Sequence, residues 1–144
     1  MSIWKTTPDL DRLNHPTTEH LGTNLGIEFT RVTDDTLEAR MPVDERTRQP
    51  FGILHGGASV VLAETLGSVA SHHVVGQGDQ MPVGLEVNAN HLRPVSQGSV
   101  TAVCRPVHLG RTTHVWDIRI HDEQGRATCI SRLTVAIVPR PRLS

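Results

Sequence analysis

The chain has 144 residues, 37% of them hydrophobic, and a formal net charge of −1. A charge so close to zero argues against a broad nucleic-acid-binding or anionic-membrane surface. No apolar stretch is long enough for a transmembrane helix and the first residues lack the apolar core of a signal peptide, so we expect a cytoplasmic protein without a membrane span. The length suits one domain, residues 1–144, in which residues 1–25 form an N-terminal helical extension.

The first 43 residues predict two short helices followed by a β-hairpin. Thr7 can cap the first helix, and Pro8 suits its first turn. Apolar and polar side chains then alternate on both sides of Asp34 and Asp35, which is typical of two strands joined by a turn. The expected boundaries are residues 7–14 and 18–21 for the helices and residues 26–33 and 36–43 for the strands.

The next element is one long helix over residues 56–75, and its side chains are apolar or small on almost every face. Such a helix is typically buried. Glu64 is the only formally charged side chain between Gly56 and Gly78, and a carboxylate in these surroundings is costly unless it is paired or protonated. Glu64 is therefore a candidate base or nucleophile, and the alternative is a buried structural carboxylate satisfied by a hydrogen bond or a partner arginine. Ser68 lies one turn further on the same face and is either functional or a small packing residue.

Four further strands are predicted after this helix. In one of them Trp116, Ile118 and Ile120 share a face, as strand geometry requires. Tight turns between these strands point to antiparallel pairing. One face of a flat sheet cannot cover a helix that is apolar all round. We therefore expect an α+β fold in which the antiparallel sheet wraps around the central helix, a second subunit covers the rest of the helix, or both. The expected strands are residues 81–91, 99–107, 113–122 and 126–138.

The motifs around the helix resemble one family. The most specific runs from Gln49 to Glu64 and contains His55-Gly56-Gly57-Ala58. Shorter matching stretches are residues 42–44, 84–91 and 108–110. Together with the strand–helix–strand order, they resemble the hotdog-fold acyl-CoA thioesterases of the 4-hydroxybenzoyl-CoA thioesterase type, which carry a helix glutamate.

The resemblance implies a hotdog fold and hydrolysis of an acyl or aryl thioester of coenzyme A or of a carrier protein. It implies that Glu64 is the base or nucleophile and that the Gly56 N–H stabilises the oxyanion, with Gln49 and His55 beside the thioester and Ser68 one helical turn beyond Glu64. No cofactor is implied, because coenzyme A is part of the substrate. The stretches that would hold the coenzyme A arm contain Gly84, His91, Leu92, Arg93, Pro94, His108, Leu109, Gly110, Arg111, Thr112 and Thr113.

The residues at the start of the helix are themselves suited to thioester hydrolysis. A helix start offers unpaired N–H groups and a favourable dipole, and glycines allow a ligand to approach the backbone closely. Gly56 and Glu64 are eight residues apart, about 12 Å along one helix axis, so one helix cannot easily present both to one thioester. Two antiparallel helices around a two-fold axis can. We therefore expect a homodimer with shared active sites, which the family often pairs into a homotetramer.

Other functions stay open from the sequence. A hotdog hydratase or dehydratase would pair a histidine with an acid, and His55 is nine residues before Glu64. A non-catalytic acyl-CoA sensor would need an output module. The nine histidines form no HExxH pattern or comparable cluster, so no metal site is expected. The acyl group, the choice between coenzyme A and a carrier protein, and the choice between base and nucleophile are all undetermined.

Overall fold

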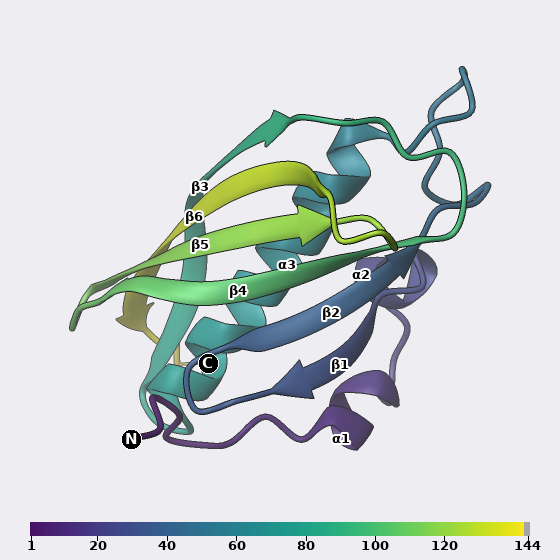
Figure 1. The fold of residues 1–144 in the computed structure, drawn as a ribbon. Coiled ribbons are helices and arrows are strands. Elements are labelled where there is room, and N and C mark those ends of the chain that lie inside the picture. The colour runs from purple at the N-terminus through teal and green to yellow at the C-terminus, as the bar shows by residue number, and fades with distance from the viewer. Residues whose placement is uncertain (143–144) are drawn as a thin grey trace.

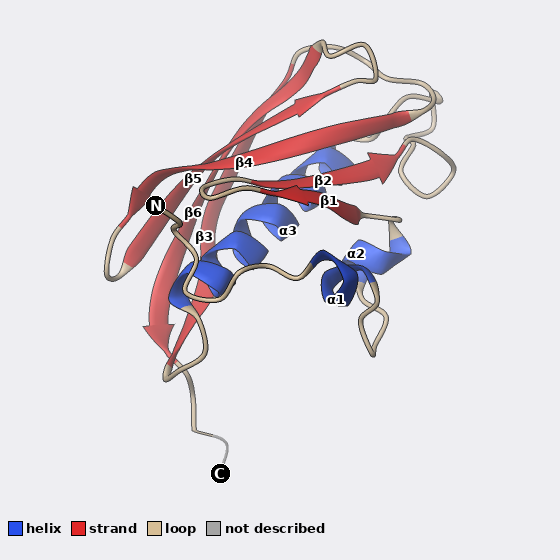
Figure 2. Cartoon of the chain, turned by 60° about the horizontal axis from the view of Figure 1, so that its bottom comes forward, coloured by secondary structure: helices blue, strands red, loops and turns tan. Residues whose placement is uncertain are grey.

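A six-stranded antiparallel sheet curves around one long helix, α3 (Gly56–Val75), in the concave space that Figures 1 and 2 show. The structure, a computed structural model, describes residues 1–142, so the last two residues of the expected 1–144 domain lie outside it. The strand order is β1-β2-β4-β5-β6-β3, and every pairing is antiparallel. The other elements are α1 (Leu10–Asn14), α2 (Leu21–Asn24), β1 (Glu28–Val32), β2 (Leu37–Pro42), β3 (Gln80–His91), β4 (Ser99–Leu109), β5 (Thr113–His121) and β6 (Ala127–Pro139). The antiparallel sheet around a central helix is the predicted α+β architecture.

Both short helices begin later than expected: α1 ends at Asn14 as predicted but starts at Leu10, and α2 lies over residues 21–24 and not 18–21. Asp9, not Thr7, caps α1, since its carboxylate accepts the N–H of Arg12 at 3.2 Å. His20 caps α2: its Nδ1 atom accepts the N–H of Gly22 at 3.2 Å, and its backbone N–H donates to Oγ1 of Thr23 at 2.8 Å. Both caps have side chains that bond backbone N–H groups left free at a helix start.

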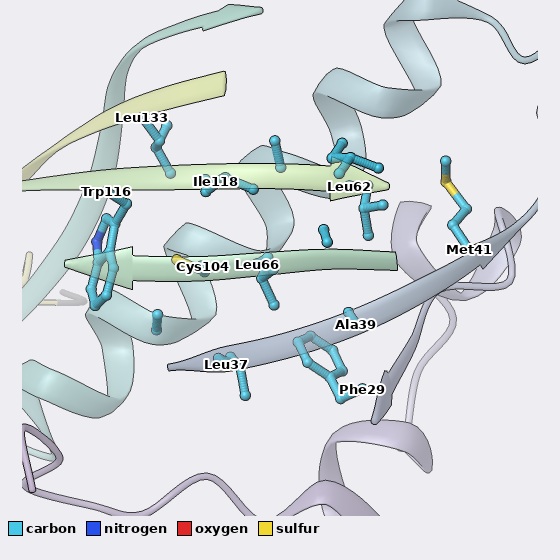
Figure 3. Close-up of a cluster of buried hydrophobic side chains, with 14 of the residues drawn as sticks. Phe29, Leu37, Ala39, Met41, Leu62, Leu66, Cys104, Trp116, Ile118 and Leu133 are labelled. Carbon is cyan, nitrogen blue, oxygen red and sulfur yellow. The ribbon is translucent and has the colours of Figure 1, made fainter. Parts of the chain in front are cut away.

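The core fills the space between α3 and the concave face of the sheet (Figure 3). Leu62 and Leu66 on the helix pack with Ile118 and Leu133 on the strands, and all four are fully buried. Each such side chain contributes about 1.5–3 kcal/mol to the free energy of unfolding. Gly67 allows close contact, because a Cβ atom there would lie 2.5 Å from Cδ2 of Leu133.

The edge of the sheet formed by β3 is not covered. Within residues 1–142, β3 pairs on one side only, with β6. Val83 and Leu85 on this strand are 42% and 63% exposed, and the side of α3 that carries Glu64 and Ser68 is only partly buried. The long apolar helix is therefore buried by its own sheet on one side and left partly open on the other. None of the helices in the described part of the chain is long and apolar enough to cross a membrane.

Candidate active site

The predicted site residues separate into two groups near opposite ends of the sheet. The glycine half-site comprises Gln49, His55, Gly56 and residues 91–94 and lies at the start of α3, beyond the ends of β2 and β3. The glutamate half-site comprises Glu64, Ser68, Gly84 and residues 108–113. Figure 1 shows the β4–β5 hairpin at one end of the sheet and the loop before α3 at the other. The strand register supports this separation. Gly84 and His114 lie at the same level of the sheet because both pair with Val135, and this level is far from the end of β3 at His91.

The start of α3 presents a free backbone N–H. The Nδ1 atom of His55 accepts the N–H of Gly57 at 2.8 Å, and the carbonyl of His55 accepts the N–H groups of Ala58 and Ser59 at 3.0 and 3.3 Å. Within residues 1–142, the N–H of Gly56 donates to no group. A free N–H at the positive end of a long helix suits the stabilisation of a developing oxyanion. His55 therefore acts here as the helix cap.

A cavity of about 380 Å³ lies beside this N–H. The ring of His91 lies against Gly56, because a Cβ atom on Gly56 would be 2.8 Å from Nε2 of that ring. The side-chain oxygen of Gln49 accepts the N–H of Phe51, which leaves its amide group free to donate. The cavity thus brings together six of the predicted site residues, namely Gln49, Gly56, His91, Leu92, Arg93 and Pro94.

Glu64, in the other half-site, lies against a glycine on β3. A Cβ atom on Gly84 would be 2.7 Å from Oε1 of Glu64, so the missing side chain makes room for the carboxylate. A β-bulge follows at once, since the register shifts between Gly84 and Glu86. Among residues 1–142 the Glu64 carboxylate forms no ion pair. The structural alternative, a carboxylate satisfied by a hydrogen bond or a partner arginine, therefore has no partner arginine within residues 1–142. Gly84 was expected along the coenzyme A arm, and the structure places it beside the candidate base.

Replacing Gly84 by alanine should lower kcat by about 10- to 100-fold and leave the melting temperature nearly unchanged. The added methyl group would displace the end of a flexible side chain, which is tolerated in folding, whereas a misplacement of about 1 Å at a reacting group costs about 100-fold. Steady-state kinetics and thermal unfolding measure the two effects. Gly78→Ala is the matched control, because a Cβ atom there meets nothing within 4 Å. An unchanged kcat for Gly84→Ala would contradict the placement.

The β4–β5 hairpin is attached to α3 by a buried polar cluster. The Oγ atom of Ser71 accepts the indole N–H of Trp116 at 2.8 Å and lies 3.0 Å from Nδ1 of His114. Burial lowers the pKa of His114, and the nearby His108 lowers it further. A neutral imidazole can accept the Ser71 hydroxyl proton, which completes a chain of hydrogen bonds from strand to helix. This cluster attaches the start of β5, which follows the β4–β5 turn, to the C-terminal part of α3.

Comparison with known proteins identifies the family. Residues 51–129 match the profile of the Thioesterase superfamily. The chain belongs to this superfamily. The proofreading thioesterase EntH of Cronobacter turicensis is 55% identical over 94% of this chain and 98% of that protein. The 1,4-dihydroxy-2-naphthoyl-CoA hydrolase of Escherichia coli is 54% identical over 94% of this chain and 99% of that protein.

A solved structure gives the same result. The Q49A variant of thioesterase PA1618 from Pseudomonas aeruginosa superposes with a TM-score of 0.93 at 58% identity, covering 96% of this chain and 99% of that one. The family resemblance and the hotdog fold predicted from the sequence are confirmed. This member of the thioesterase superfamily is a thioester hydrolase, the enzyme class that the motifs predicted.

Sequence reasoning missed three residues near the site. Ser59 lines the glycine cavity, and its position three residues after Gly56 on the same helix side was an available signal. Ser71 and His114 hold the hairpin, but they come from distant segments, so no local pattern indicated their contact.

Proposed function

We propose that this thioesterase hydrolyses aryl- or acyl-CoA thioesters, with Glu64 as base or nucleophile and the Gly56 N–H as oxyanion donor. The observation that carries the proposal is a pair of groups on α3 that have no partner within residues 1–142: the N–H of Gly56, which donates no hydrogen bond, and the carboxylate of Glu64, which forms no ion pair. The relative from Escherichia coli is named for an aryl-CoA substrate, which supports an aryl acyl group. A carrier-protein thioester is the alternative substrate of the same chemistry.

In the proposed reaction the thioester carbonyl oxygen accepts the N–H of Gly56. Negative charge develops on that oxygen when the carbonyl carbon is attacked, and the helix dipole stabilises it. Glu64 either removes a proton from the attacking water or attacks the carbon itself to form an anhydride that water then hydrolyses. On both routes the C–S bond breaks, the thiol leaves with a proton, and the free acid remains.

We infer a homodimer from the same two half-sites, because neither is complete alone. Gly56 and Glu64 are about 12 Å apart along α3, too far for one thioester to contact both. The free edge of β3, with Val83 and Leu85 exposed, is suited to pair with the same strand of a second copy. The partly open side of α3 would be covered by the same contact.

One register of pairing between the β3 strands of two copies would bring the two half-sites together. If two β3 strands pair antiparallel with Gly84 opposite His91 of the second copy, each Glu64 lies close to the other copy's glycine half-site. This follows because Glu64 contacts Gly84, and His91 contacts Gly56, within one chain. Each active site would then take Glu64 from one chain and Gly56 from the other. The pairing of dimers into a tetramer and a cytoplasmic location stay predictions.

Release of free coenzyme A thiol tests the proposed activity. Benzoyl-CoA and a medium-chain acyl-CoA should both be tried, since the acyl group is not determined. Thiol release with formation of the free acid supports hydrolysis. Hydration of an unsaturated acyl-CoA without thiol release would instead support a hydratase, and binding without turnover would support a sensor.

Arg93→Ala and Arg111→Ala should each raise KM for CoA thioesters by about three- to tenfold and change kcat less than about twofold. Arg93 lines the glycine cavity and Arg111 lies in the β4–β5 hairpin, and both are exposed. Each would contact the nucleotide phosphates in ground state and transition state alike. The effect should vanish with an acyl-pantetheine thioester, which lacks the nucleotide. Arg31→Ala, on the far edge strand, is the control, and an unchanged KM in both variants would contradict these contacts.

A further inference from the structure

The two outer strands of the sheet, β1 and β3, differ in what lies beside them. Within residues 1–142 the outer side of β3 pairs with no segment, whereas the N-terminal segment, residues 3–24, runs along the outer side of β1, with α1 next to that strand in Figure 2. Its path is antiparallel to β1, because earlier residues of the segment bond later residues of the β1–β2 hairpin. In this order Gly22, Asn14, Trp4 and Ile3 bond Ile27, Phe29, Thr33 and Asp34.

Asn14 makes the contact with β1 itself. Its Oδ1 atom accepts the N–H of Phe29 at 2.7 Å, and its Nδ2 atom donates to the carbonyl of the same residue at 2.8 Å. These are the two bonds that a residue of a neighbouring antiparallel strand would make. One side chain therefore satisfies both outward backbone groups of Phe29, in a strand that has only five residues.

Other groups of the segment close the edge on both sides of this contact. The N–H of Ile27 donates to the carbonyl of Gly22 at 2.9 Å before β1 begins, and the indole N–H of Trp4 donates to the carbonyl of Thr33 at 2.7 Å after it ends. Trp4 is buried in the core, so this contact is firmly anchored. The exposed Arg31 adds a positive charge to the same edge, and a charge there also opposes pairing with another strand.

The N-terminal segment is also attached to the central helix. The N–H groups of Lys5 and Thr6 donate to the carbonyl of His73 at 3.1 and 3.2 Å, and Nδ1 of His73 donates to the carbonyl of Thr6 at 2.8 Å. His73 lies in the last turn of α3. The segment is therefore fixed both to the edge of the sheet and to the helix that the sheet surrounds.

We propose that the N-terminal segment, through Asn14, blocks strand pairing at β1 and so restricts edge-to-edge association of the sheet to β3. A molecule with two open edges can add copies on both sides and form open-ended rows, whereas one open edge allows only a closed two-fold pair. The inference goes beyond the proposed function, because it involves neither Glu64 nor Gly56. It explains how the chain can leave a long strand with exposed apolar side chains unpaired for a second copy without forming rows.

Asn14→Ala removes both hydrogen bonds to Phe29 and tests the proposal. Amide hydrogen exchange at Phe29 should become about tenfold faster than in the wild type, because local opening of the edge then breaks fewer hydrogen bonds. As the protein concentration is raised, size-exclusion chromatography with light scattering should show species larger than the wild-type assembly. Exchange at Phe29 should then slow again as the opened edge pairs. A folded Asn14→Ala protein that keeps the wild-type size at every concentration would overturn the inference.

Two further variants separate an opened edge from partial unfolding. Asn24→Ala is the matched control, since Asn24 is an exposed asparagine of the same segment whose side chain bonds no group within residues 1–142, and it should change neither exchange nor size. Asn14→Asp also loses the donor to the Phe29 carbonyl but places a negative charge on the edge, so it should keep the wild-type size. Thermal unfolding checks that each variant folds, and Asn14→Ser, whose shorter side chain cannot bond both groups of Phe29, repeats the test if Asn14→Ala does not fold. Larger species as abundant in Asn14→Asp as in Asn14→Ala would show association through unfolding and would also overturn the inference.

Discussion

Glu64→Ala should lower kcat by at least about 10³-fold while the protein stays folded, because a positioned base or nucleophile typically contributes that much. The carboxylate forms no ion pair within residues 1–142 and is only half-buried, so few interactions within the chain depend on it. Its loss should therefore act on the reaction and not on the fold. Glu64→Gln keeps the shape of the side chain and should lose nearly as much activity, since an amide is neither a base nor a nucleophile here.

Thiol release under saturating substrate measures kcat, and thermal unfolding checks the fold. Glu19→Ala is the control, because Glu19 is an exposed carboxylate in the N-terminal extension. A loss of less than tenfold in Glu64→Ala would contradict the catalytic assignment. A full loss in Glu64→Ala with wild-type activity in Glu64→Gln would point to packing and not to proton transfer.

The central helix could be predicted accurately because its signals are local. His55 caps it through a hydrogen bond two residues along the chain, and Gly76, with φ of 76°, ends it. The strands were predicted by alternation, with errors of a few residues at their ends. β1, for example, begins later than expected because Gly26, with φ of 73°, belongs to the turn after α2. The family and enzyme class followed from the long motif between Gln49 and Glu64.

The arrangement of the site could not be predicted from local pattern, because it depends on strand order. Gly84 and His91 belong to one predicted strand, and the resemblance assigned both to the coenzyme A arm. In the structure they lie in different half-sites, one against Glu64 and the other against Gly56. Ser59 had a local signal, its spacing of three residues from Gly56, but only the fold shows that it lines the same cavity.

Subunit mixing provides the sharpest test of the shared site. Gly56→Pro removes the proposed oxyanion donor, and proline is well accepted at the first position of a helix. His55, with φ of −67° and ψ of 130°, already has the extended backbone that a following proline requires. Homodimers of Gly56→Pro and of Glu64→Ala should each be inactive, the first by about 10²- to 10³-fold as for loss of one oxyanion donor. Gly56→Ala keeps the N–H and adds only the contact with His91, so it separates the two effects of the proline.

Heterodimers of the two inactive variants should regain activity. One of the two shared sites would contain both defects, and the other would contain neither, because its Glu64 comes from the Gly56→Pro chain and its Gly56 from the Glu64→Ala chain. Activity should therefore return to as much as half of the wild-type value per dimer. Two affinity tags allow the heterodimer to be purified, and size-exclusion chromatography confirms its assembly. If each site lay within one chain, both sites of the heterodimer would carry a defect. Folded heterodimers as inactive as either parent would then show that Glu64 and Gly56 do not act across the interface.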